Sequence, residues 1–229
     1  MSWFVTYVRS SVGAKHIMAL TGLALVLFAI VHMLGHLGMF VGQDAYNAYA
    51  HTLQGLGALK WTARGGLLAL FLIHVASAIR LAAMNAAARP VKYAVYRTAS
   101  TNILARTMVW TGLALFAFIG FHLVHFTFGL VQPEYFHKLD PLERYDAYSM
   151  FVRGFQNVPI YAIYLVSILL LAGHLGHGAS SWLQSLGLRH PKYSPALDKL
   201  GPVLSVILFV GYMAPPTAVL LDIIKLPGA

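Results

Sequence analysis

The chain has 229 residues, of which 59% are hydrophobic and only 10% are charged, and its mean hydropathy is +0.69. Soluble domains carry roughly 25% charged residues, so this composition excludes an ordinary soluble globule as well as a disordered chain. An integral membrane protein is the class that remains. The chain has no cysteine, which excludes disulfides, iron–sulfur clusters, thiolate zinc sites and covalently attached haem. The net charge of +9 indicates basic cytoplasmic loops, and no nucleic-acid partner is expected.

Five apolar stretches are long enough to cross a bilayer, which requires about 20 residues. They lie near residues 13–40, 62–88, 103–131, 157–187 and 200–224, and we expect a single domain over residues 1–229. The first stretch is too long for a signal peptide and is expected to be retained. In the loop over 133–156, Asp140 and Pro141 suggest the start of a short surface helix in a solvated connector. No internal repeat aligns along the chain.

The basic residues predict how the helices are oriented. With the N-terminus inside, ten lysines and arginines fall on the cytoplasmic side and six fall outside. An excess of basic residues on the cytoplasmic side is the usual arrangement in multi-pass proteins. Five spans then place the C-terminus outside.

Histidines are concentrated in the predicted spans. Seven of the eleven lie there: His32, His36, His74, His122, His125, His174 and His177. Each of the first four spans contains at least one, and the fifth contains none. Ionisable groups inside a bilayer are costly and usually face an interior site. We therefore predict an all-α membrane protein in which helices one to four form a bundle around a cofactor and the fifth helix is peripheral.

The other residues of these spans narrow the cofactor chemistry. The first four spans contain no aspartate or glutamate in their apolar parts, which argues against a di-iron carboxylate site, a catalytic zinc site and a proton-pumping relay. Ligation of haem by two neutral imidazoles remains, and because the chain has no cysteine the haem would be of the b type. Glycines near the histidines, including Gly22 and Gly112, would allow a helix or a flat macrocycle to approach closely.

Counting along the helices predicts how the histidines pair. His32 and His122 lie 17 and 16 residues beyond the basic residue at the inner end of their helices, whereas His74 and His174 each lie 15 residues before one. At about 1.5 Å per residue, the members of each pair lie at matching depths. The count therefore pairs His32 with His122 and His74 with His174. Helical spacing alone leaves His36, His125 and His177 as alternative ligands, or as contacts to a haem propionate or a quinone.

The segments around these histidines resemble the dihaem cytochrome b (b558-type) membrane anchor of succinate dehydrogenase and fumarate reductase, the succinate:quinone oxidoreductases of complex II. The resemblance covers nearly the whole chain and depends on the order and spacing of several segments: SSVGAKHIMALTGLAL, VHMLGHLGMF, LFLIHVASAIRLA, ARPVKY, GFHLVHF and AGHLGHGASSWLQSLGLRHPKY. His36 is a departure, since asparagine is expected there, and no acidic residue accompanies His174. These departures leave the proton route open.

The resemblance implies two b haems, with His74 and His174 ligating the inner haem and His32 and His122 the outer one. It implies a bacterial cytoplasmic membrane location, with a flavoprotein carrying FAD and an iron–sulfur subunit docked on the cytoplasmic face. Candidate docking or lipid contacts on that face are Arg89, Lys92, Arg97, Arg189 and Lys192. A homo-oligomer of the whole complex stays open.

The resemblance further implies electron transfer through both haems to menaquinone or another quinone. Candidate quinone contacts near the outer haem are His36, His125, Asp44, His51 and Gln54. The chain itself would perform no dicarboxylate chemistry. The alternatives are a dihaem anchor of a hydrogenase or formate dehydrogenase, a haem-free transporter with polar helices, and a structural anchor without haem.

Overall fold

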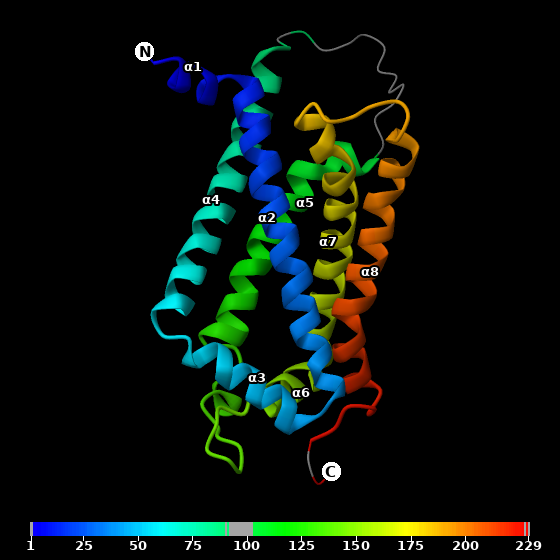
Figure 1. Cartoon of the computed structure of the whole chain (residues 1–229). Coiled ribbons are helices and arrows are strands. Elements are labelled where there is room, and N and C mark those ends of the chain that lie inside the picture. The colour runs from blue at the N-terminus through cyan, green and yellow to red at the C-terminus, as the bar shows by residue number, and fades with distance from the viewer. Residues whose placement is uncertain (1, 90, 92–102, 227, 229) are drawn as a thin grey trace.

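The computed structural model describes residues 2–89, 91, 103–226 and 228, and all of its long elements are helices. Five are long and apolar enough to cross a membrane: α2 (Ser11–Leu37), α4 (Ala58–Ala87), α5 (Ile103–His122), α7 (Val158–Ser185) and α8 (Ser194–Leu220). Figure 1 shows them side by side, with the two termini at opposite ends of the molecule. The prediction of an all-α chain with five candidate membrane spans is confirmed.

The shorter elements lie at the two ends of the long helices. Helix α1 (Trp3–Arg9) lies at one end, which we call the α1 end, and α3 (Gln43–Gly55) and α6 (Ala147–Gln156) lie at the other, the α3/α6 end (Figure 1). Two 3₁₀ turns, η1 (Gly38–Phe40) and η3 (Pro133–Tyr135), and a π-helical turn, η2 (Leu123–Thr127), complete the described elements.

Helix α6 corrects the prediction for the loop over 133–156. It begins after Asp146, whose side chain accepts a hydrogen bond from Ser149 N at 3.1 Å and so caps the helix, and not at Asp140. It is also not a solvated connector, because Phe151, Val152 and Phe155 are almost fully buried. These apolar side chains pack beneath α3 and the ends of α5 and α7.

Helix α2 lies centrally and packs against α4, α7 and α8, and α7 also packs against α5. The contact between α7 and α8 is the most extensive of the helix pairs, and it includes a hydrogen bond from Ser205 Oγ to Ala172 O at 2.6 Å. Tyr212 of α8 also donates to Ala29 O of α2 at 2.6 Å. The fifth span thus packs against two of the histidine-bearing helices, α2 and α7.

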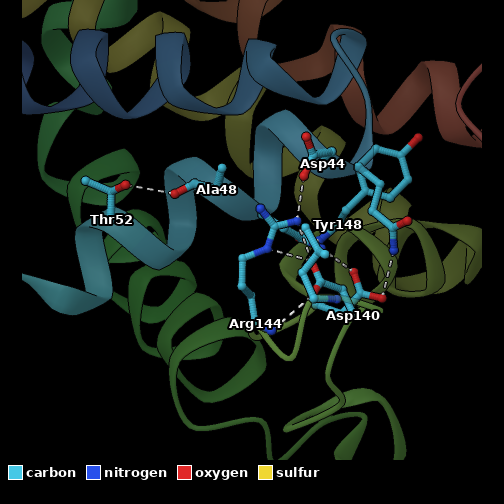
Figure 2. A network of polar contacts seen from close by, with 10 residues as sticks. Asp44, Ala48, Thr52, Asp140, Arg144 and Tyr148 are labelled. Atoms are coloured by element: carbon cyan, nitrogen blue, oxygen red, sulfur yellow. Dashed lines mark hydrogen bonds and ion pairs between the residues drawn. The ribbon is translucent and has the colours of Figure 1, made fainter.

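A buried polar network joins α3 to the segment before α6. Asn47 is fully buried, and its amide donates to Asp140 Oδ2 at 3.2 Å and to Asp146 Oδ1 at 2.9 Å. The Arg144 guanidinium donates to Asp140 and to Asp44, each at 2.7 Å (Figure 2). These hydrogen bonds from Arg144 hold the pKa of Asp140 at about 2, well below its usual value.

Candidate histidine site

The structure places the histidines of the spans at two depths. Thr21 lies 11 residues before His32 on α2 (32 − 21), and 11 residues are slightly more than three whole turns, so both residues lie on one face of the helix about 16 Å apart along the axis. His74 lies beside Thr21 and His122 beside His32. We call His74 and His174 the α1-side pair, and His32 and His122 the α3-side pair.

His74 of α4 is held against α2 by a threonine and a glycine. Thr21 Oγ1 lies 3.2 Å from His74 Nδ1 and donates its own proton to the Ile17 carbonyl at 2.7 Å. The threonine oxygen must therefore accept the bond from His74 Nδ1–H. Since a neutral imidazole carries one N–H, Nε2 keeps its lone pair available for a metal. A Cβ on Gly22 would stand only 3.1 Å from His74 Cε1, so glycine makes room for the ring.

His174 of α7 has the same surroundings on α5. Thr111 Oγ1 lies 3.1 Å from His174 Nδ1 and donates to the Thr107 carbonyl at 3.1 Å. His174 therefore also carries its proton on Nδ1 and has an unprotonated Nε2. A Cβ on Gly112 would stand 3.4 Å from His174 Cε1.

These matching contacts reveal an internal repeat, which corrects the expectation that no repeat aligns. The pentapeptide TGLAL occupies 21–25 on α2 and 111–115 on α5, and in each case a histidine follows the threonine by 11 residues (32 − 21 and 122 − 111). In each half the Thr–Gly pair receives a histidine from the next long helix, α4 or α7. The roles of Thr21 and Thr111 escaped sequence reasoning, although the repeated pentapeptide was a signal that could have shown them.

His122 is oriented by a chain of hydrogen bonds. His125 Nε2 lies 3.1 Å from the Gln132 carboxamide oxygen, which can only accept, so His125 is protonated on Nε2. Its Nδ1 then accepts the proton of Tyr164 Oη at 3.1 Å. The Tyr164 oxygen in turn accepts from His122 Nδ1–H at 3.2 Å. His122 is therefore a third histidine with an unprotonated Nε2.

The π-helical turn η2 explains why His125 does not share the orientation of His122. The turn widens the helix directly after His122, and π-bulges of this kind are frequent at functional sites. His125 is buried with both ring nitrogens bonded, so it is not available as a metal ligand. The predicted contact of His125 with a propionate or a quinone stays a prediction.

His36 also has both nitrogens engaged. Its Nδ1 lies 2.8 Å from Tyr46 Oη, and its Nε2 lies 3.3 Å from His32 Nε2. Burial raises the pKa of the Tyr46 hydroxyl, which keeps it protonated. His32 differs from the three other candidate ligands because its Nε2 meets another imidazole. His177 lies half-buried one turn after His174.

The spacing within the α3-side pair is compatible with a shared metal ion. The ring centroids of His32 and His122 are 5.9 Å apart. Two imidazoles on opposite sides of one ion hold their nitrogens about 4 Å apart, because each metal–nitrogen bond measures about 2 Å. Among the described residues, no three His, Cys, Asp or Glu side chains gather as a metal site. The α3-side pair thus offers two imidazoles, and further ligands of a metal ion held there would have to come from a cofactor.

Of the quinone candidates of the sequence, His36 contacts His32 of the α3-side pair, and the three on α3 lie further from it. Asp44 is exposed and forms an ion pair with Arg144 (Figure 2). His51 is exposed on α3. Gln54 lines a cavity of about 220 Å³ together with Phe126, whose ring centroid lies 5.9 Å from that of His122. Gln54 is therefore the member of this set that shares a cavity wall with the histidine site.

Two of the predicted docking or lipid contacts, Lys92 and Arg97, lie outside the described residues, as does half of the ARPVKY segment. Comparison with known proteins gives no family model, no curated protein and no solved structure that matches this chain.

Proposed function

We propose that this protein is the membrane anchor and electron-transfer subunit of a succinate:quinone oxidoreductase and binds two b haems. His74 and His174 would hold one haem, and His32 and His122 the other. The observation that carries the proposal is the contact of Nδ1 with a hydroxyl oxygen, that of Thr21, Thr111 or Tyr164, in three of these four histidines, an arrangement that suits an imidazole with its lone pair on Nε2. Ligating histidines characteristically donate their other N–H to a fixed acceptor.

The residues around each pair suit a macrocycle of this kind. Each histidine of the α1-side pair packs against a Thr–Gly pair of the neighbouring helix. The threonine fixes the orientation of the imidazole ring, and the glycine lets the ring approach closely. Apolar side chains of the spans would exclude water from the metal. A bound haem supplies one-electron transfer at its iron, and the protein sets the potential through its axial ligands and their hydrogen bonds.

Because the two histidine pairs lie at different depths, electron transfer between them would move charge across the membrane. The pairs are separated by about 16 Å along the axis of α2, so an electron that passes between them moves charge across part of the bilayer. One charge moved across 100 mV corresponds to about 2.3 kcal/mol. Electrons would enter at the α1 end and reach menaquinone, or another quinone, at the α3/α6 end.

The partners follow from the sequence resemblance and from charge. We propose that the α1 end faces the bacterial cytoplasm and receives a flavoprotein and an iron–sulfur subunit. Arg189 and Lys192 lie exposed near this end in the segment that joins α7 to α8. Dicarboxylate chemistry would take place on the partner subunits.

The test is to purify the tagged chain together with its membrane partners and to add succinate. Copurification of a flavoprotein and an iron–sulfur subunit, with succinate-dependent reduction of b-type haem, would support the proposal. A dihaem protein that copurifies with a hydrogenase or a formate dehydrogenase would assign it to that other class. A preparation without haem would exclude both dihaem anchors and would leave a transporter or a structural anchor as the alternatives.

A further inference from the structure

Arg64 lies at the same depth as the α3-side pair. Thr21 of α2 contacts His74 of the antiparallel helix α4, so the residue of α4 level with His32, 11 residues further along α2, lies near position 63 (74 − 11). The same count in the second half, from Thr111 and His174, gives position 163, and the neighbouring Tyr164 does contact His122. Arg64, in the half formed by α2 and α4, therefore corresponds to Tyr164 in the half formed by α5 and α7.

Arg64 lines the cavity of about 220 Å³ that borders the site. Lys60, Gln54, Phe126, Phe136 and His137 line it as well. Phe126 forms a common wall, since its ring lies against His122 and His125 with centroid distances of 5.9 and 3.9 Å. The cavity therefore brings cationic side chains to the histidine site from α4.

The charges of this cavity lack an anion among the described residues. The guanidinium of Arg64 and the ammonium of Lys60 flank the Trp61 ring at 5.3 and 5.7 Å, and Lys60 also donates to the Gln54 carbonyl at 2.9 Å. Neither forms an ion pair with a described carboxylate. Arg64 lies in the second turn of α4, about 9 Å inside its first residue. Two cationic side chains without a described carboxylate partner make this cavity suited to an anionic ligand.

We propose that Arg64, assisted by Lys60, binds the propionate carboxylates of the haem held by the α3-side pair. This inference rests on the proposed function. Two carboxylates match two cations in charge, and the planar guanidinium suits a carboxylate better than an ammonium group does. The two cations would also favour the reduced state of this haem more strongly than a neutral pocket would, because reduction adds negative charge at the iron.

The test is a redox titration of the purified complex with the variants R64Q and R64K. In R64Q, the ratio of reduced to oxidised haem at fixed ambient potential should fall about tenfold for one haem, which for a one-electron couple is about 59 mV. R64K should retain most of the wild-type potential. The affected haem should be the one that loses its ligand in a His122 variant, and the other haem should not change.

Arg153→Gln is the matched control, since Arg153 also lies at the α3/α6 end and contacts an aromatic ring, that of Tyr135, but lines a different cavity. If R64Q does not assemble, the same titration of K60Q decides. Unchanged potentials in the glutamine variants, or a shift in the haem of the α1-side pair, would overturn the inference. So would a loss of bound phospholipid without a change in potential, since Arg64 would then bind a lipid phosphate. A wild-type protein without haem would instead contradict the proposed function itself.

Discussion

Thr21 Oγ1 lies 3.2 Å from His74 Nδ1 and donates its proton to the Ile17 carbonyl, so this hydroxyl acts as an acceptor toward the imidazole. The contact fixes both the rotation of the ring and the nitrogen that carries the proton. A threonine in an apolar helix thereby gains a role in the chemistry of a residue on the neighbouring helix.

Thr21→Val should weaken haem binding at the α1-side pair about 10- to 100-fold, the usual cost of losing a partner of a ligating histidine. Valine has the shape of threonine but offers no acceptor to His74 Nδ1–H. Haem content and the reduced-minus-oxidised spectrum measure the effect. Thr21→Ser, which keeps the hydroxyl, is the control and should behave like the wild type.

Thr111→Val should diminish the same spectral component as Thr21→Val, because His74 and His174 are proposed to bind one haem from opposite sides. Overlaying the difference spectra of the two variants decides the point. If the two variants diminish different components, the pairing of the histidines is wrong.

Tyr164→Phe should perturb the other haem. The variant removes the oxygen that accepts from His122 Nδ1–H and the proton that His125 receives, so the affinity for that haem is expected to fall about 10- to 100-fold. Tyr212→Phe is a suitable control, since the Tyr212 ring lies 6.2 Å from His32 but its hydroxyl bonds a backbone carbonyl. Equal effects of both variants would argue against a specific role for Tyr164.

His36→Gln and His32→Gln should have different effects, although the two histidines lie one turn apart. His36 bonds Tyr46 and His32, so its replacement should leave two haems per chain. Replacement of His32 should leave one. Haem-to-protein ratios of the purified variants test this, and the loss of a haem in H36Q with retention of both in H32Q would reverse the assignment.

The network around Asp140 predicts how stability depends on pH. Arg144 lowers the pKa of Asp140 in the folded protein to about 2, below the value near 3.8 expected for an unperturbed aspartate. The stabilisation is therefore complete above about pH 4 and is lost as the pH falls toward 2. Melting temperatures recorded between pH 5 and pH 2 should fall in that window for the wild type and less steeply for Asp140→Asn. The exposed Asp198 at the other end is the control position, and its asparagine variant should follow the wild-type curve.

The long helices and the positions of their histidines were predictable because a bilayer demands long apolar segments, and ionisable residues stand out within them. Helix α3 was not predicted, and the start of α6 was misplaced at Asp140. Both are short helices whose stability depends on tertiary contacts such as those of Asn47, which sequence periodicity does not show.

The candidate site was partly readable as well. Spacing placed His36 beside His32 and His125 beside His122 but did not separate their roles. That distinction depends on partners distant in the chain, such as Tyr164, and on the π-helical turn after His122. The close packing of α8 against α2 and α7 was missed because the fifth span contains no histidine.

Four imidazoles from α2, α4, α5 and α7 are proposed to hold two haems, and the dithionite-reduced minus oxidised spectrum of the purified complex is the measurement that decides this. We expect a b-type α band with about two haems per chain. Fully assembled protein that shows no such band would contradict it.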